Sequence, residues 1–380
     1  MFLKEVHARK IPDSRGDPTI EVAINGVKAS SPSGKSKGKH ETPSFHKSLE
    51  WNLNFLNKTT FNLEINSFQD LKKVEAFIRK KAKLKDAKQF GANALFALEC
   101  AILKALAKEQ KVALFQLLNK KPRKLPIPVG NAIEGGLHAH EKNHPVFQEF
   151  LLIPKEHSPK KNVSILTNLH AKLKEIVKSN KKTDEGAWEA AIHEEQIFEI
   201  FSRFKNIRFG TDVAASSFYS KGNYIHKNKI LDRETQIRYI NYLIKDFNIF
   251  YCEDPLDEED FKGFSKVFRD KNHLVVGDDL TATQIPRLKK AIRMKSINAM
   301  IIKPNQNGSL IELAEIFKIC KKNDIKTILS HRSGETLDNA LADLAVGFDA
   351  DYIKCGISTK WREVKLKRLI EIEKILKKTN

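Results

Sequence analysis

The chain has 380 residues, of which 41% are hydrophobic and 30% are charged, a composition typical of a folded globular protein. Its formal net charge of +20 invites a nucleic-acid-binding interpretation, although composition does not show whether the charge is clustered. The first five residues lack the apolar core of a signal peptide, and no apolar stretch approaches the roughly 20 residues of a membrane helix. The four cysteines form no C-x-x-C pair, which argues against a disulfide scaffold or a zinc ribbon and favours a reducing, cytoplasmic location.

Residues 1–125 are expected to form a small α+β domain. Ile20–Ile24 alternates apolar and polar side chains as a half-buried strand does, and Asn25-Gly26 is a hairpin turn signal. Helical periodicity follows over residues 68–85 and 92–108. A cluster of prolines then interrupts the chain, which places the domain boundary between residues 125 and 126.

Residues 126–380 alternate short apolar runs with stretches of helical periodicity, the pattern of repeated β and α units. Six of these runs end at charged or ionisable side chains, namely Asp212, Glu253, Asp278, Lys303, His331 and Lys354. Because the carboxyl ends of parallel barrel strands meet on one face, these side chains are expected to converge in one pocket. A solvated residue at a strand end is the alternative for any single one, but it explains the ordered set poorly. The pattern predicts a TIM-type (β/α)8 barrel that follows a smaller N-terminal α+β domain.

Three of these strand ends carry carboxylates, Asp212, Glu253 and Asp278, whose oxygens are the ligands that Mg²⁺ prefers. The alternative is an anionic patch that lysines alone neutralise. Lys303 follows in the same ring. A lysine whose pKa is lowered by partial desolvation and nearby positive charge can act as a general base, and the alternative for Lys303 is a salt bridge with Asp278.

Other residues suit a general acid and an anion clamp. Glu149 and Glu185 are candidates for the acid, with acidic surface loops as the alternative. His331, Arg332, Ser333 and Lys354 would serve an anionic substrate, because arginine binds phosphate and carboxylate groups. Base, acid, metal and clamp together indicate proton abstraction beside a carboxylate with loss of a leaving group.

The motifs of the chain resemble those of the enolase family, in order and over nearly the whole length. Ala8–Thr19 is similar to the family's opening A-R-x-I-x-D-S-R-G-N-P-T, and Pro32–Gly38 resembles its mobile P-S-G-A-S-T-G loop. Gly135–Ala139 resembles G-G-S-H-A, whereas Gly277–Thr281 and Ser330–Glu335 match the family motifs letter for letter. Each motif is short, but their ordered combination is very specific.

One motif departs from the family pattern. The family's G-D-E-G-G-F is here T-D-E-G-A-W, so that Ala187 stands where the family has a glycine. A stiffer or rerouted loop around Glu185 is expected from this change.

The resemblance implies Mg²⁺-dependent dehydration of 2-phosphoglycerate to phosphoenolpyruvate, with two Mg²⁺ ions per active site, the second bound with the substrate. Enolase-superfamily sites generally combine a lysine or histidine base with one or two Mg²⁺ ions. The resemblance implies that Asp212, Glu253 and Asp278 are ligands of the first Mg²⁺, that Lys303 is the base at C2, and that Glu185, assisted by Glu149, is the acid. It implies that Gln148 and Lys354 contact the substrate carboxylate and that His331, Arg332 and Ser333 hold the phosphate. Ser36 and His138 would lie on loops that close over the substrate, with Ser36 reaching the second Mg²⁺. A homodimer or larger homo-oligomer is also implied.

Two alternatives stay open. One is an enolase-like enzyme for a different acid-sugar substrate, against which the S-H-R-S-G-E run argues. The other is a non-catalytic protein that binds nucleic acid or an acidic surface, for which the sequence offers charge but no motif. The basic stretch Lys360–Lys378 carries an apolar stripe, which predicts the last helix of the barrel with a solvated basic face.

Overall fold

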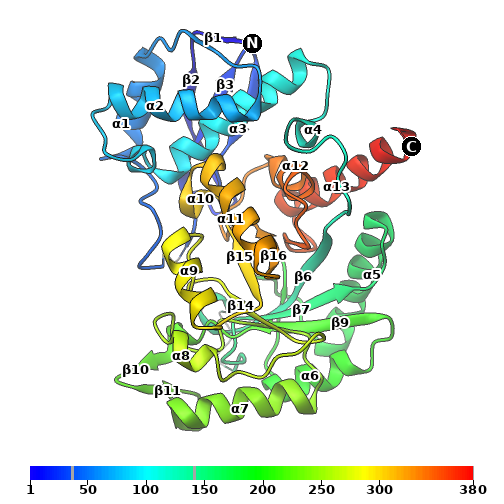
Figure 1. Ribbon diagram of the computed structural model, residues 1–380. Coiled ribbons are helices and arrows are strands. Elements are labelled where there is room, and N and C mark those ends of the chain that lie inside the picture. Colours follow the sequence, from blue (N-terminus) through cyan, green and yellow to red (C-terminus); the bar gives the residue numbers. More distant parts are fainter. Residues whose placement is uncertain (36–37, 140–142, 380) are drawn as a thin grey trace.

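The chain folds into an N-terminal α+β domain and a C-terminal barrel, drawn in blue to cyan and in green to red in Figure 1. This structure is a computed structural model, and it describes residues 1–35, 38–139 and 143–379, without the side chains of His138 and Thr379. The N-terminal domain is built from β1 (Phe2–Leu3), β2 (His7–Pro12), β3 (Pro18–Ile24), β4 (Val27–Ser30), α1 (Leu49–Lys58), β5 (Leu63–Glu64), the 3₁₀ helix η1 (Phe68–Asp70), α2 (Leu71–Lys81), the 3₁₀ helix η2 (Ala87–Phe90), α3 (Ala92–Glu109) and α4 (Leu114–Leu118).

The elements predicted for this domain are present. β3 and β4 pair antiparallel around Asn25 and Gly26, which have φ values of 49° and 74°. Positive φ at both central residues is what a type I′ hairpin turn requires. The helix expected over residues 68–85 is shorter, because α2 ends at Lys81, whereas α3 covers the second predicted helix. The boundary between residues 125 and 126 stays a prediction.

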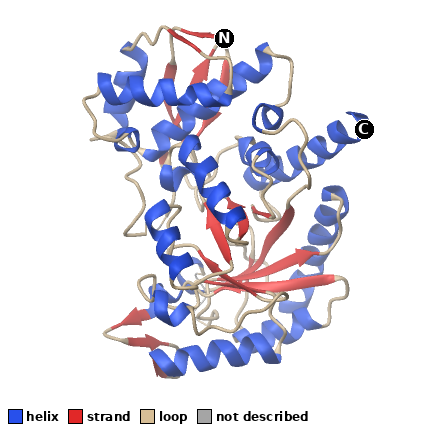
Figure 2. Cartoon of the chain, viewed as in Figure 1, coloured by secondary structure: helices blue, strands red, loops and turns tan. Residues whose placement is uncertain are grey.

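The barrel is closed, because the last strand pairs with the first. Its strands in order around the ring are β6 (Ile127–Glu134), β7 (Glu149–Pro154), β9 (Ile207–Asp212), β13 (Tyr251–Glu253), β14 (Leu274–Gly277), β15 (Ala299–Ile302), β16 (Lys326–Ser330) and β17 (Tyr352–Lys354). The apolar runs predicted from the sequence correspond to the last six of these strands. Figure 2 shows the strands gathered at the centre, with helices outside them.

One strand runs against the expectation of a uniformly parallel barrel. β7 pairs antiparallel with both β6 and β9. Its first residue, Glu149, therefore lies opposite Asp212, the last residue of β9. The amino end of β7 thus supplies a carboxylate to the face at which the other strands end.

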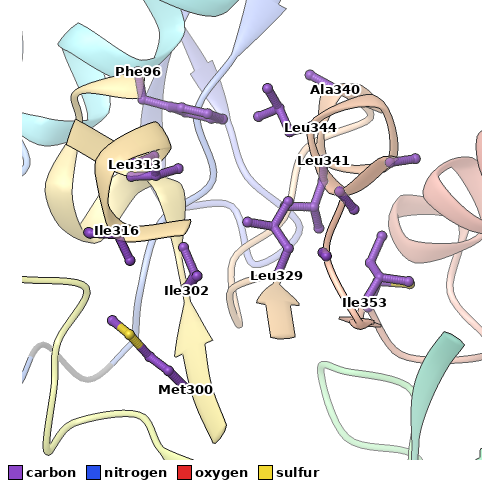
Figure 3. Close-up of a cluster of buried hydrophobic side chains, with 14 of the residues drawn as sticks. Phe96, Met300, Ile302, Leu313, Ile316, Leu329, Ala340, Leu341, Leu344 and Ile353 are labelled. Atoms are coloured by element: carbon purple, nitrogen blue, oxygen red, sulfur yellow. The ribbon is translucent and has the colours of Figure 1, made fainter. Parts of the chain in front are cut away.

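Barrel strands alternate their side chains between the interior and the surrounding helices. In β15, Ala299 and Ile301 belong to the apolar cluster inside the barrel, whereas Met300 and Ile302 belong to the cluster outside it. Figure 3 shows Ile302 near Ile316 and Leu313 of α11 (Leu310–Lys322), with Met300 farther down β15. Phe96 of α3 lies above Leu313 in the same view. One continuous core therefore fixes the N-terminal domain to the barrel.

The remaining elements lie outside the barrel ring or in its connections. They are the 3₁₀ helix η3 (Gly136–His138), α5 (Pro159–Val177), β8 (Trp188–Glu189), α6 (Glu194–Ser202), the 3₁₀ helix η4 (Ala215–Phe218), β10 (Tyr219–Ser220), β11 (Asn223–Ile225), β12 (Ile230–Asp232), α7 (Arg233–Asp246), α8 (Phe261–Phe264), α9 (Ile285–Arg293), α10 (Pro304–Asn307), α12 (Ala340–Gly347) and α13 (Lys360–Thr379). Across the described ranges, every helix is too short or too polar to span a bilayer.

α13 is the last helix, as predicted, but the expected solvated basic face is only partly correct. Arg362 and Lys365 are buried, with exposed fractions of 0% and 1%. Lys365 Nζ lies 2.5 Å from Glu335 and donates hydrogen bonds to the carbonyl oxygens of Thr336 and Trp361. Some of the chain's positive charges are therefore buried and bonded within the fold instead of facing solvent.

Substituting Lys365→Met should lower the free energy of unfolding by about 3–5 kcal/mol, because it leaves the Glu335 carboxylate buried without its cation. Urea unfolding followed by circular dichroism measures the change. The matched control is Lys367→Met on the same helix, whose ion pair with Glu363 is exposed. That control should stay within about 0.5 kcal/mol of the parent. Equal effects of the two substitutions would contradict a buried structural role for Lys365.

Candidate functional site

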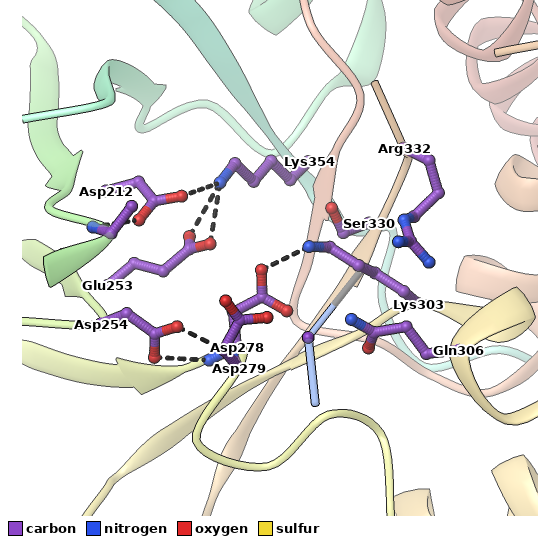
Figure 4. Close-up of polar contacts among 12 residues, drawn as sticks. Asp212, Glu253, Asp254, Asp278, Asp279, Lys303, Gln306, Ser330, Arg332 and Lys354 are labelled. Carbon is purple, nitrogen blue, oxygen red and sulfur yellow. Dashed lines mark hydrogen bonds and ion pairs between the residues drawn. The ribbon is translucent and has the colours of Figure 1, made fainter. Parts of the chain in front are cut away.

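The carboxyl ends of the barrel strands surround a small polar cavity of about 60 Å³. Most of the predicted site residues line it. The lining residues are Gly34, Gln148, Glu149, Glu185, Asp212, Asp278, Lys303, Ser330, His331, Arg332, Ser333 and Lys354. Five of the six predicted strand ends thus share one cavity, and Glu253 joins them through Lys354 (Figure 4).

Lys354 connects three carboxylates at the ends of neighbouring strands. Its Nζ lies 2.9 Å from Glu149 Oε2, 3.4 Å from Asp212 Oδ2 and 2.9 Å from Glu253 Oε2. Burial alone would lower the pKa of Lys354, but Glu149 and Glu253 raise it well above its ordinary value, so the side chain is an ammonium. Burial, reinforced by Glu253, also raises the pKa of Asp212 well above its ordinary range.

Lys303 forms a second ion pair, with Asp278 Oδ2. Burial favours a lowered pKa for Lys303, but Asp278 outweighs burial and raises it. Burial likewise favours a raised pKa for Asp278, and Lys303 instead lowers it. In this structure the pKa of Lys303 is therefore raised rather than lowered, and the salt bridge with Asp278, which was the alternative for this lysine, is present.

Two aspartates that the sequence analysis did not single out support this strand end. Asp254 accepts hydrogen bonds from the backbone N–H groups of Asp278, at 3.0 Å, and Asp279, at 2.7 Å. Carboxylate oxygens of these three residues lie within 4.8 Å of one another. Asp254 follows Glu253 directly and has a positive φ of 38°, which turns it toward the next strand. Burial and Asp278 together raise the pKa of Asp279 to about 7.

Three buried glutamates form a second group beside Lys354. Oxygens of Glu134, Glu149 and Glu185 lie within 4.8 Å of one another. Burial, opposed by Lys354 and reinforced by Glu185, raises the pKa of Glu149 to about 7. Glu134 was not predicted as a site residue, because the residues around it in the sequence give no signal for one. It ends β6, the strand next to the one that carries Glu149.

Glu185 lies on a tight loop between α5 and β8. The loop is closed by hydrogen bonds from Thr183 N to Ala187 O and from Gly186 N to Thr183 O. Ala187 is fully buried. His170 of α5 bonds the Gly186 carbonyl through Nε2 at 2.9 Å. The residue that replaces the family's glycine is thus accommodated, and the carboxylate of Glu185 still reaches the cavity.

The loop contact of His170 predicts a pH dependence of stability. Burial, reinforced by Lys182, lowers the pKa of His170 from 6.5 to about 4. Between these pH values the unfolded chain binds the proton and the folded chain does not, so stability falls as the pH falls, by about 3 kcal/mol in all. Urea unfolding of the parent and of His170→Gln between pH 7 and 4 should show that this slope is specific to the parent. Parallel curves would contradict the assignment.

Two of the three residues predicted to hold phosphate, Arg332 and Ser333, already contact the N-terminal domain. Arg332 forms two hydrogen bonds of 3.0 Å with the carboxylate of Glu41. Ser333 Oγ accepts hydrogen bonds from Arg15 Nη1 at 3.0 Å and from Lys35 N at 2.8 Å. Ser14 N also donates to Glu335 O at 2.7 Å. The opening motif of the chain therefore holds the loop that follows β16.

Two predicted site residues fall outside what the structure describes. Ser36 lies outside the described residues. The same holds for the side chain of His138, whose backbone ends η3. Gln148 is placed beside the cavity, and its backbone N–H donates to Asp212 O at 3.0 Å.

The donor set of the cavity suits a hard divalent cation. The oxygens of Asp212, Glu253 and Asp278 come from neighbouring strand ends. Asp278 Oδ1 is buried and receives no hydrogen bond from any described residue. A buried acceptor without a donor costs about 1–3 kcal/mol, which a bound cation would relieve. The lysine pairs alone therefore do not satisfy this carboxylate group.

A wider groove of about 600 Å³ lies at the opposite end of the barrel, where β16 begins and Asp351 precedes β17. Most of its charged side chains pair with each other, as Lys326 does with Asp324 at 3.1 Å and Lys124 does with Asp351 at 2.5 Å. Paired surface charges of this kind do not converge on a reacting group, so the smaller cavity is the candidate active site.

Both parts of the chain match models of known protein families. Residues 3–118 match the family "Enolase, N-terminal domain", and residues 122–380 match "Enolase, C-terminal TIM barrel domain". A protein of Archaeoglobus fulgidus named Enolase is 34% identical and covers 100% of this chain and 98% of its own length. Proteins of the same name from Methanocorpusculum labreanum and Natronomonas pharaonis are also 34% identical, over 98% of this chain and 98% and 99% of their own lengths. The chain is therefore a member of the enolase family.

Proposed function

We propose that this protein is a lyase, a phosphopyruvate hydratase, that dehydrates 2-phosphoglycerate to phosphoenolpyruvate. The proposal depends most on one observation: carboxylates, lysines, a histidine and an arginine at one end of the barrel line the same small cavity. Full-length similarity to proteins named Enolase supports the same activity. Rigid strand ends hold the reacting groups at fixed positions, which lowers the entropic part of the barrier.

Asp212, Glu253 and Asp278 would hold Mg²⁺. When bound, the cation supplies positive charge beside the substrate carboxylate, on which a second negative charge builds up as the C2 proton leaves. The unsatisfied Asp278 Oδ1 supports this assignment. We propose two ions per site, the second arriving with the substrate and reaching Ser36.

Lys303 is the proposed base at C2, and Glu185 is the proposed acid at C3. To accept the C2 proton on Nζ, Lys303 must be the neutral amine, so its ion pair with Asp278 must break and the ammonium must release a proton before the substrate reacts. Glu185 then protonates the departing C3 hydroxyl group as water leaves. Glu149 assists, because its raised pKa of about 7 lets it share a proton near neutral pH.

The remaining side chains of the cavity would bind the substrate. Lys354 and Gln148 lie on the side of the carboxylate cluster and would contact the substrate carboxylate. His331, Arg332 and Ser333 would hold the phosphate, and His138 would close over the substrate. Arg332 already pairs with the Glu41 carboxylate through both of its terminal nitrogens, and a planar guanidinium binds phosphate in the same bidentate way, which supports this role.

We also propose that the protein is a homodimer and that it is located in the cytoplasm. The four cysteines are buried and unpaired, which suits a reducing compartment. Light scattering of the purified protein tests the dimer.

The activity is tested by incubating the full-length protein with 2-phosphoglycerate and Mg²⁺ and following phosphoenolpyruvate by its ultraviolet absorbance. We expect turnover that a chelator abolishes and that added Mg²⁺ restores. A folded, Mg²⁺-loaded protein without turnover would refute the proposed reaction and leave the other acid-sugar substrate and the binding role as the alternatives.

A further inference from the structure

Arg362 in the first turn of α13 is a fully buried guanidinium, with an exposed fraction of 0%. A buried charge is costly unless its hydrogen-bonding groups are satisfied. Gly356, with a φ of 73°, makes room for this side chain, because a Cβ there would lie 2.5 Å from Arg362 Cδ. The fold therefore accommodates this arginine at a specific place behind the cavity.

Each of the nitrogens of Arg362 has acceptors. Nε donates to His331 Nδ1 at 3.2 Å, Nη1 donates to Asp184 O at 3.1 Å and to Thr359 Oγ1 at 3.3 Å, and Nη2 donates to Arg332 O at 3.3 Å and to Ser333 O at 3.1 Å. These bonds use the full fork of five N–H groups that an arginine offers. They join the loop that carries Glu185 to the loop after β16.

The bond to His331 fixes the position of the imidazole proton. Arginine only donates, so His331 Nδ1 must accept and carries no hydrogen. Burial lowers the pKa of His331 well below its ordinary value, so the ring is neutral and its proton is on Nε2. That nitrogen lies 3.3 Å from Glu185 Oε2.

We propose that Arg362 is a positioning residue for the reaction: it fixes the Nε2–H tautomer of His331, and His331 in turn holds the carboxyl group of Glu185. The importance of Glu185 rests on the function proposed above. Arg362 Nη2 also lies 3.9 Å from Glu185 Oε1, so the two oxygens of this carboxyl group face the histidine and the arginine.

Glu185 needs these contacts with Arg362 and His331 because other carboxyl groups lie close to it. Oxygens of Glu134 and Glu149 lie within 4.8 Å of Glu185, and whenever two of these carboxyl groups are ionised their charges repel each other at that distance. The Nε2–H of His331 and the guanidinium of Arg362 face the two oxygens of Glu185 and offset that repulsion, which favours the place of this carboxyl group at the cavity.

The direct test is ¹⁵N NMR of the imidazole nitrogens in the full-length protein, with His331→Gln to identify the signal. We expect an unprotonated Nδ1 and a protonated Nε2 at neutral pH. A protonated Nδ1 would overturn the proposal, whether or not the protein turns over 2-phosphoglycerate. The result of this measurement therefore does not depend on whether the proposed reaction is correct.

Arg362→Lys then tests the consequence, because lysine keeps the charge but loses the fixed fork. We expect a mixed tautomer of His331 and a kcat lowered roughly 10- to 100-fold with little change in KM. The matched control is Arg368→Lys on the same helix, whose guanidinium binds Asp343 away from the cavity. An unchanged tautomer and kcat in a folded Arg362→Lys variant would contradict the proposal. Should that variant not fold, the tautomer of the parent remains the deciding result.

Discussion

Replacing Lys303 by alanine is expected to abolish exchange of the C2 proton of 2-phosphoglycerate with solvent and to lower kcat by roughly 10²- to 10⁴-fold, the usual contribution of a general base. Lys303 Nζ lies at the cavity beside Asp278, and it follows β15, a rigid strand. Proton exchange in deuterated water, followed by NMR of the substrate, measures the first half of the reaction without requiring loss of water. It therefore separates the base from the acid.

Two further variants make the result specific. Lys303→Met keeps most of the side-chain volume and should behave like the alanine variant. Lys326→Ala removes a lysine at the beginning of β16, at the opposite end of the barrel, and should leave exchange unchanged. Retained C2 exchange in a folded Lys303→Ala variant would rule out Lys303 as the base.

The strand ends were the part of the site that could be predicted from the sequence. Buried parallel strands are short apolar runs, and a charged residue where such a run stops is visible without any structure. Asp212, Glu253 and Lys354 came together for this reason. Glu149 could not be placed this way, because it begins an antiparallel strand, and the direction of β7 depends on pairing with β6 and β9.

The supporting residues depend on contacts between distant segments and were missed for that reason. Arg362 lies in a lysine-rich stretch that reads as a solvated helix face, and its buried position is set by the loops that α13 packs against. Glu41 meets Arg332 across 291 positions of sequence. Only the tertiary fold shows that some of the +20 charge is used internally, as at Lys365 and Arg362.

Asp278→Asn is expected to weaken Mg²⁺ binding at least roughly 10- to 100-fold, the cost usually measured even for outer-shell partners of a metal site. The substitution keeps the size of the side chain but removes its charge and turns one oxygen into a donor. Isothermal titration with Mg²⁺ in the absence of substrate measures the change without reference to turnover. The control is Asp324→Asn, whose side chain is 94% exposed, and which should bind Mg²⁺ like the parent.

This experiment also decides between the two explanations that the carboxylate cluster allows. If Asp278 serves only as the ionic partner of Lys303, the amide variant loses an ion pair and its Mg²⁺ affinity stays unchanged. If Asp278 is a ligand, affinity falls even though Asp212 and Glu253 keep their contacts with Lys354. The free Oδ1 of Asp278 favours the second outcome, because an ion pair made through Oδ2 leaves that buried oxygen without a partner among the described residues.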